Sequence, residues 1–225
     1  MQGKESGVEQ MESDVRELAA TVQNPHLRQL LAAILAPAGQ TWASFRVAPA
    51  AKHYHQAYRH GLLEHSLTVA QAVSAISALF GGIDRDVAVT AALLHDIGKL
   101  DTYELTDDGI EMTDRGRLHG EIALGYFRIR SELERIEGFP EALSRTLLHI
   151  ILSHHGALEH GSPVVPCTRE ATVVHMADNL SSKLGSFDRV QHTLADGVDW
   201  AGWDKGVGGA AYFGPAPEPV HAQAA

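Results

Sequence analysis

The spacing of apolar residues along this 225-residue chain follows a helical period over most of its length. Apolar positions three and four residues apart run from Leu62 to Phe80, where Gly81-Gly82 follow, and they return after Asp84 as far as about Asp96. Such spacing predicts amphipathic helices, and Asp84 is of the residue type that caps a helix amino terminus. We therefore expect two consecutive helices in this part of the chain.

Other segments have the same period together with helix start and stop residues. Asn24-Pro25 and Pro166 with Thr168 are typical of helix starts. Further helices are predicted at 9–22, 24–37, 117–137, 140–155 and 168–190. Residues 101–114 differ, because Tyr103 to Leu105 and Ile110 to Met112 flank Asp107-Asp108-Gly109, a pattern that predicts a small hairpin or lid.

These elements predict an all-α fold with a small hairpin or lid insertion. We expect a helical extension at 1–40, one main domain at 41–205 with a connector near Ala48-Pro49-Ala50-Ala51, and an irregular, disordered tail at 206–225. Segment 198–214 is rich in glycine and tryptophan and should be irregular. Its aromatic residues are expected to pack over the core; they are Trp200, Trp203, Tyr212 and Phe213.

The composition is that of an ordinary globular protein, with 44% hydrophobic and 20% charged residues. The polar first residues are not followed by an apolar stretch, and the longest apolar run, Leu30 to Ala38, is interrupted by Pro37 and is too short to cross a bilayer. Cys167 is the only cysteine, so no internal disulfide is possible, in keeping with a reducing compartment. We expect a cytoplasmic protein that does not associate with a membrane.

A formal net charge of −10 argues against broad electrostatic capture of a nucleic-acid backbone. It does not exclude a nucleic-acid substrate, since bound divalent cations would invert the local charge. The chain also has fourteen histidines, several of them inside apolar helical patterns. Any buried imidazole or carboxylate among them needs a partner.

Three predicted helices each present a histidine or aspartate within apolar surroundings. His95-Asp96 ends an alanine-rich helix, and His65 and Asp178 each lie inside an apolar helix. A lone His-Asp pair is more often structural than functional. Because buried charges are expected to be paired or bound to metal, the three helices together indicate one shared ion.

The order and spacing of these residues resemble the HD superfamily of metal-dependent phosphohydrolases. Further blocks, spanning most of residues 45–205, resemble the YhaM-type 3′–5′ exoribonucleases within it. The resemblance implies an HD-domain helical bundle. The blocks are Ala48 to Lys52, Ala57-Tyr58, Gly61 to Leu67, Leu93 to Lys99, Ile151 to Gly156, Gly161 to Pro163, Pro166 and Ala177 to Leu180.

The resemblance implies that a first metal ion is held by His65, His95, Asp96 and Asp178, with Asp96 bridging to a second ion if one binds. A shell of imidazole and carboxylate admits Mn, Fe, Co, Ni or Zn, and the family favours Mn. Such an ion lowers the pKa of a water molecule that it binds and polarises a phosphoryl oxygen. Hydrolysis by metal-activated water then requires no nucleophilic side chain. Whether one or two ions bind stays open.

His154 continues the apolar stripe of Leu143, Leu147 and Ile150, so it should face inward and bind a second metal ion or the scissile phosphate. His155 could contact substrate or merely cap its helix.

At 116–121 the relatives tend to read Gly-x-Leu-Leu-Gly-His, where this chain has Glu121 in place of the final histidine and His119 in place of a leucine. Residues 119 and 121 would point to opposite sides of a regular helix, so only one could ligate. Glu121 is a competent metal ligand, and an exposed Glu121 is an equal alternative.

Basic and aromatic residues supply candidates for substrate binding. Lys99, one turn beyond Asp96, is a candidate catalytic cation for a phosphate oxygen, with an ordinary surface lysine as the alternative. Contacts to substrate phosphates and bases are also expected from Lys52, His55, Tyr58 and Arg117, although packing explains Tyr58 equally well. The chain departs from its relatives here, at Gln56 and His60.

The leading hypothesis is a 3′–5′ exonuclease acting on short RNA or single-stranded DNA. Exoribonucleases of this type carry an amino-terminal OB-fold, whereas the residues before the matching blocks look helical, so no five-stranded barrel is expected there. A phosphohydrolase for nucleotides or small phosphate esters is the alternative enzyme. A non-catalytic HD-fold sensor of metal or nucleotide is a further alternative. No protein partner is evident, and the oligomeric state stays open.

Overall fold

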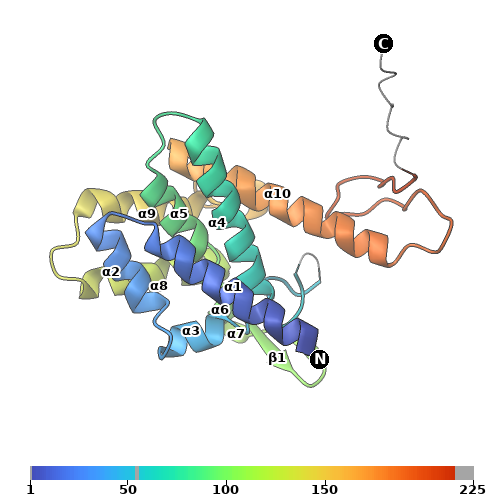
Figure 1. Ribbon diagram of the computed structural model, residues 1–225, viewed down its shortest axis with the longest axis horizontal. Coiled ribbons are helices and arrows are strands. Elements are labelled where there is room, and N and C mark those ends of the chain that lie inside the picture. Colours follow the sequence, from blue (N-terminus) through green and yellow to red (C-terminus); the bar gives the residue numbers. More distant parts are fainter. Residues whose placement is uncertain (1, 54–55, 216–225) are drawn as a thin grey trace, which may run out of the picture.

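The computed structural model describes residues 2–53 and 56–215 of the chain as a helical bundle with one small hairpin (Figure 1). This confirms the predicted fold class. The helices and strands are α1 (Gln2–Ala20), α2 (Pro25–Ile34), α3 (Gln40–Phe45), α4 (Gly61–Leu79), α5 (Arg85–Leu94), α6 (Lys99–Thr102), β1 (Tyr103–Thr106), β2 (Gly109–Met112), α7 (Asp114–His119), α8 (Glu121–Arg135), α9 (Glu141–Ser153), the 3-10 turn η1 (Leu158–His160) and α10 (Arg169–His192).

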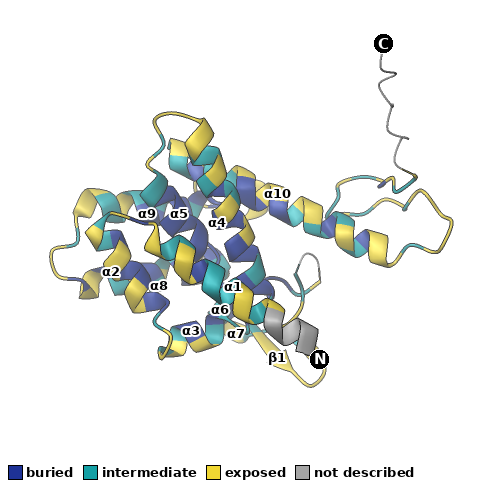
Figure 2. Cartoon of the chain, in the orientation of Figure 1, coloured by how far each residue is buried: buried dark blue, intermediate teal, exposed yellow. Residues whose placement is uncertain are grey.

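Helix α5 lies at the centre of the bundle, where α4, α9 and α10 surround it (Figures 1 and 2). Every residue from Val87 to Leu94 is buried, as expected for a helix that is covered on all sides. Helix α4 packs along it, with Leu62, Leu63 and Val69 fully buried. By length and composition α4 could span a bilayer, but its buried residues face this core, which accounts for its apolar character.

The amino-terminal helices α1 and α2 cover one flank of the core. Val15 of α1 and Leu27 of α2 are fully buried in the same apolar cluster as α4 and α5. The turn between α1 and α2 is held by Asp86 at the start of α5, whose carboxylate accepts hydrogen bonds from the amides of Gln23 and Asn24 at 2.7 and 2.8 Å. The predicted amino-terminal extension therefore contributes to the main core.

The helix starts expected from the sequence are formed by side-chain caps. Asn24 accepts from the amides of His26 and Leu27 at the start of α2, and Asp84 accepts from Val87 at the start of α5. Thr168 does the same for α10. Each cap satisfies an amide that has no partner within its own helix. These local signals place the starts of α2, α5 and α10 correctly, whereas α1, predicted at 9–22, begins at Gln2 and ends at Ala20.

The predicted hairpin is present and projects from the bundle. Strands β1 and β2 pair antiparallel, with Tyr103 opposite Met112 and Thr106 opposite Gly109. The turn is made by Asp107-Asp108, and Gly109 follows it with φ of 124°, a conformation open to glycine. Lys52 joins the hairpin to the preceding connector through an ion pair with Glu111 at 2.7 Å.

Two expectations about helices were wrong. The segment predicted as one helix at 117–137 is divided into α7 and α8 at Gly120, whose φ of 75° and ψ of 152° are not helical. Apolar spacing continues across the break, so periodicity alone could not show it. Helix α3 was not predicted; its Trp42 and Phe45 are buried against the core, and six residues are too few for a periodic signal.

The carboxyl-terminal half of α10 extends away from the bundle and carries an irregular loop (Figure 1). The loop folds back on the helix through Asp204, which pairs with Arg189 at 2.8 Å. Trp200 and Trp203 are 61% and 73% exposed, so the expectation that they pack over the core was wrong; Trp200 pairs instead with Tyr212 of the same loop. Of the predicted tail, residues 206–215 lack helix and strand, and 216–225 lie outside the described residues.

Candidate metal centre

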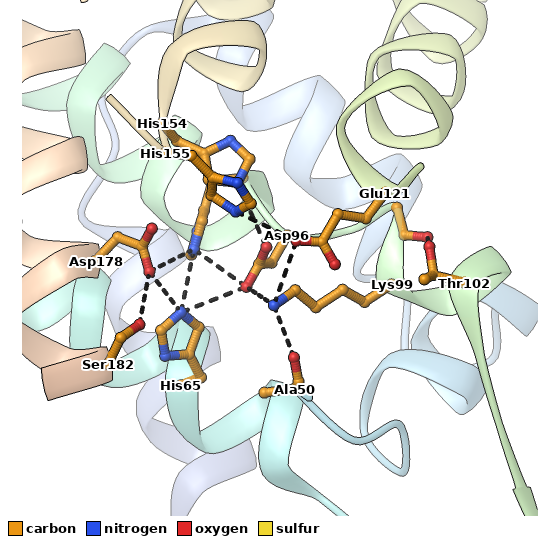
Figure 3. Close-up of polar contacts among 12 residues, drawn as sticks. Ala50, His65, Asp96, Lys99, Thr102, Glu121, His154, His155, Asp178 and Ser182 are labelled. Carbon is orange, nitrogen blue, oxygen red and sulfur yellow. Dashed lines mark hydrogen bonds and ion pairs between the residues drawn. The ribbon is translucent and has the colours of Figure 1, made fainter. Parts of the chain in front are cut away.

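The four residues predicted as ligands of a first metal ion meet where α4, α5 and α10 come together, and three of them, His65, Asp96 and Asp178, are labelled in Figure 3. His65 lies in the first half of α4, His95 and Asp96 follow the last residue of α5, and Asp178 lies in the middle of α10. All four are buried, with exposed fractions between 0% and 8%. Charged and imidazole groups this deep in a protein require close partners.

The side-chain atoms of this group converge on one point. The Nε2 of His65 lies 3.1 Å from Oδ1 of Asp178, 3.4 Å from Oδ2 of Asp96 and 3.3 Å from Nε2 of His95. The Nε2 of His95 lies 3.4 Å from Asp96 and 3.7 Å from Asp178. The ligand atoms of His65, His95 and Asp178 thus lie within 4.8 Å of one another, and Oδ2 of Asp96 contacts both rings. Imidazole and carboxylate groups are ligands that divalent transition metals accept.

The other ring nitrogen of each histidine is engaged away from this centre. Nδ1 of His95 lies 2.8 Å from the carbonyl oxygen of Ala92, to which it can only donate. Nδ1 of His65 lies 3.3 Å from the hydroxyl of Ser181. A second partner of this kind fixes the ring and leaves Nε2 as the ligating atom.

The charges of the group favour a cation. Burial alone would raise the pKa of Asp96, but the ammonium of Lys99 and the His95 ring hold it well below its usual range. Burial would likewise raise the pKa of Asp178, and hydrogen bonds from His65 and His95 lower it. The pKa of His95 is raised to about 10 because its two carboxylate neighbours outweigh burial. A metal ion would replace a proton here.

A second group of candidate ligands adjoins the first on the side of α9. It consists of Asp96, His154 and His155, whose ligand atoms lie within 4.8 Å of one another. Oδ1 of Asp96 and Nε2 of His154 are 3.5 Å apart, and both are buried with no hydrogen-bond partner among the described residues. Unpaired buried polar atoms are costly, so this pair also fits a bound cation.

His154 follows the last residue of α9, as His95 follows the last residue of α5. Its Nδ1 lies 2.7 Å from the carbonyl of Ile151, which leaves Nε2 to face Asp96. Burial lowers the pKa of His154, so its ring is neutral and Nε2 can accept. The ring faces inward, in agreement with its place in the apolar stripe.

Glu121 is the first residue of α8, and its carboxylate points toward the same centre (Figure 3). Its Oε1 lies 3.2 Å from Nε2 of His155 and 3.8 Å from Nζ of Lys99. Burial would raise the pKa of Glu121, but Lys99 and His155 lower it. His119, on the other side of the break at Gly120, is exposed. Of His119 and Glu121, the two departures from the expected pattern at 116–121, Glu121 is the one beside the second group.

Lys99 is buried, which excludes the surface alternative considered for it. Its ammonium lies 3.0 Å from Oδ2 of Asp96 and donates to the carbonyl of Ala50 at 2.7 Å. Burial would lower its pKa, but Asp96 and Glu121 raise it, so the side chain stays charged. It therefore ties the connector before α4 to the centre.

The remaining predicted substrate-binding residues make contacts elsewhere. Lys52 pairs with Glu111 on the hairpin, and Tyr58 donates to Glu64 at 2.8 Å. Arg117 donates to the carbonyl of Met112 at 3.3 Å. His55 lies outside the described residues. Among the described members of the predicted substrate-binding set, only His155 makes contacts within the centre, and the roles of the set stay predictions.

The structure adds residues that the sequence did not single out. A cavity of about 180 Å³ opens beside Asp178 and Lys99. His175 and Ser182 lie three residues before and four residues after Asp178, so they share its face of α10. That helical spacing is the signal that could have found them. The other residues lining the cavity are His155, His160 and Asn179.

Comparison with known proteins agrees with this geometry. The model of the HD domain family matches residues 62–183, which include both groups of candidate ligands. Among curated proteins, the chain is 31% identical over 177 residues to a 3'-5' exoribonuclease YhaM of Bacillus pumilus, a region that covers 78% of this chain and 54% of that protein.

Other relatives give the same result. Proteins with that name from Shouchella clausii and Bacillus subtilis are 30% and 33% identical, over 83% and 69% of this chain and 57% and 49% of their own lengths. The chain thus spans about half the length of the curated relatives that it matches. No solved structure matches it. With a family match over more than half of its residues, and with the His and Asp side chains gathered at one buried point, the chain belongs to the HD-domain family.

Proposed function

We propose that this chain is a metal-dependent phosphohydrolase that cleaves the phosphodiester bonds of short RNA or single-stranded DNA from the 3′ end. The observation that carries the proposal is the buried meeting point of His65, His95 and Asp178, with the unpaired Oδ1 of Asp96 beside it. The exoribonuclease name of the relatives supports the substrate class.

In this proposal His65, His95, Asp96 and Asp178 hold the first cation, and Asp96 reaches the second group with its other oxygen. A divalent cation bound there supplies a Lewis acid for a phosphoryl oxygen and lowers the pKa of water. Manganese is our first candidate, with Fe, Co, Ni and Zn also compatible with imidazole and carboxylate ligands.

The protein's own side chains position the phosphate and accept the proton of the attacking water. Lys99 lines the cavity beside Asp178 and is buried, so a phosphate oxygen bound there would lie near a buried positive charge. Hydrolysis forms a bond from the water oxygen to phosphorus, breaks the bond to the leaving oxygen and transfers a proton to it. Nε2 of His154 lies 3.5 Å from Oδ1 of Asp96 and makes no hydrogen bond among the described residues, so it is placed to ligate a cation or to accept the proton of the attacking water.

The dimensions of the centre favour short substrates. The cavity beside Lys99 has a volume of about 180 Å³, and a second one beside Glu121 about 340 Å³. Together with a net charge of −10, this argues for a terminal nucleotide or short oligonucleotide rather than a long tract of RNA. Hydrolysis of mononucleotides is the second candidate, and the same cavities favour it.

The proposal is tested on protein purified without chelator, first by metal analysis and then by turnover. We expect one or two transition-metal ions per chain and, with an oligonucleotide labelled at its 5′ end, a ladder of products that shortens from the 3′ end. Activity confined to a panel of mononucleotides would overturn the exonuclease assignment. Bound metal without hydrolysis of any of these substrates would instead support a sensor.

The variant Asp96→Ala provides the first prediction. It removes an oxygen from both groups of ligands, so we expect loss of bound metal and of turnover with the helical circular dichroism spectrum retained. Asp108→Ala is the matched control, since Asp108 is an exposed carboxylate in the hairpin turn. An Asp96→Ala protein that keeps its metal and its activity would contradict the site assignment.

A further inference from the structure

Two cavities meet at the metal centre, and two histidines line both of them. One is the cavity of about 180 Å³ beside Asp178, and the other, of about 340 Å³, lies beside Glu121. His155 and His160 belong to the lining of each. A substrate bound across the centre could therefore extend into both cavities at once.

The two cavities differ in chemistry. The smaller one is lined by Lys99 and by the polar side chains of His175, Asn179 and Ser182, which suit a phosphate group. The larger one has apolar walls made by Ile122, Ala123, Leu152 and Pro163. His119 and His160 add two imidazole rings to its lining.

The larger cavity is joined directly to the predicted chemistry. Glu121 lines it and lies 3.2 Å from Nε2 of His155, which also lines it. His155 is in turn one of the three residues of the second group of candidate ligands. A molecule held in this cavity would thus have one end at the metal centre.

The loop that carries His160 is held in place by its own backbone. Nδ1 of His155 lies 2.9 Å from the carbonyl oxygen of His160, and the amide of Ser162 donates to the carbonyl of Ala157 at 3.2 Å. Gly161, with φ of 92°, makes the turn that follows. Nδ1 of His160 lies 3.4 Å from the carbonyl oxygen of His155, so one edge of the ring is held by the backbone while the residue lines both cavities.

We propose that the larger cavity binds the nucleobase of the nucleotide whose phosphate lies at the metal centre. The proposal rests on the function proposed above and adds a site to it. A volume of about 340 Å³ is at the lower end of the range for small-molecule sites, which suits one nucleoside. Apolar walls with imidazole rings accept the face of any base, because stacking does not depend on base identity.

The test compares two ligands that share a phosphate ester and differ in the base. Calorimetry on the full, metal-bound chain measures the affinities of AMP and of ribose 5-phosphate, while released phosphate is followed in the same samples. We expect AMP to bind about tenfold more tightly, the order expected from one stacked base. Equal affinities would overturn the base site. Turnover is read separately, so absence of hydrolysis bears only on the proposed function.

Two pairs of variants locate the effect. Ala123→Trp fills the cavity and should remove the preference for AMP, whereas Ala142→Trp, at an exposed alanine near the start of α9, should not. His160→Ala should also weaken AMP binding, and His160→Phe, which keeps a ring, should restore it. If Ala123→Trp lowers stability, the His160 pair decides alone. Retention of the full preference in His160→Ala and Ala123→Trp would overturn the proposal.

Discussion

Two histidines of the centre are oriented by the same local device. His95 and His154 each follow the last residue of a helix, and each places Nδ1 within 2.8 Å of the carbonyl oxygen three residues earlier. Carbonyls in the last turn lack an amide partner within their own helix, so the imidazole both satisfies one and becomes fixed by it. Nε2 is then directed to the interior in both cases.

Gly98 leaves room for the backbone of α8 because it has no side chain. Its φ of −65° is open to any residue, but a Cβ there would lie 2.0 Å from the carbonyl oxygen of Glu121 and 2.5 Å from the amide of Gly125. Helix α8 can approach the centre only because this side chain is missing. The position of Glu121 therefore depends on Gly98, a residue that is not itself a candidate ligand.

Gly98→Ala should destabilise the protein by about 3 kcal/mol or more, because backbone atoms of α8 must move to make room. The corresponding fall in Tm is about 6–12 °C for a chain of this size. Scanning calorimetry measures it, and metal analysis reports whether the displaced α8 disturbs the centre. Gly81→Ala is the control, with nothing within 4 Å of the added Cβ. Equal Tm values for the two variants would contradict the packing argument.

At the scale of elements, the break between α7 and α8 decides which side chain reaches the centre. Gly120 is at once the residue after α7 and the residue before α8. Because the chain changes direction there, His119 and Glu121 are not two positions of one regular helix. Glu121 begins α8 and meets Lys99 and His155.

Gly120→Ala tests this break. Its φ of 75° with ψ of 152° belongs to a region that is essentially restricted to glycine, and nothing lies within 4 Å of the added Cβ, so backbone strain is the only cost. We expect a loss of about 1–3 kcal/mol, seen as a Tm lower by about 2–12 °C. Gly202→Ala, which is equally open but lacks a positive φ, should leave Tm unchanged. A Gly120→Ala protein as stable as this control would contradict the expectation that alanine is strained in the backbone conformation of position 120.

For the whole molecule, the centre connects helices that are far apart along the chain. His65 of α4, His95 after α5 and Asp178 of α10 meet at one point, although more than a hundred residues separate the first from the last. A bound ion would link the two helices that pack on the central α5. Binding to the folded state alone stabilises it by mass action.

Metal removal should therefore lower the thermal stability. At a free metal concentration about a thousand times the Kd, the stabilisation is about 4 kcal/mol. Chelation should then lower Tm by about 8–16 °C, and added metal should restore it. Asp178→Asn keeps the shape of the side chain and removes its charge, so its Tm should hardly respond to chelator. An unaltered chain whose Tm is the same with and without chelator would contradict a metal centre that links these helices.

The sequence by itself determined most of the helices, three of their caps, the hairpin and the candidates for the metal centre. These depend on short-range physics: periodic apolar residues, a capping side chain such as Asp84, and polar residues such as His65 and Asp178 that cannot be buried alone. Local patterns of this kind involve residues close together in the sequence, so they can be recognised without the tertiary structure.

Only the tertiary structure decided the distances, the burial of Lys99, the direction of Glu121 and the exposure of Trp200 and Trp203. Each depends on which helices pack together and where the chain turns, as at Gly120, and those contacts join residues remote in sequence. The larger cavity, of about 340 Å³, also could not be predicted from the sequence, because its walls come from α8, α9 and the loop after α9. Periodicity describes one element at a time, so it cannot give the space between elements.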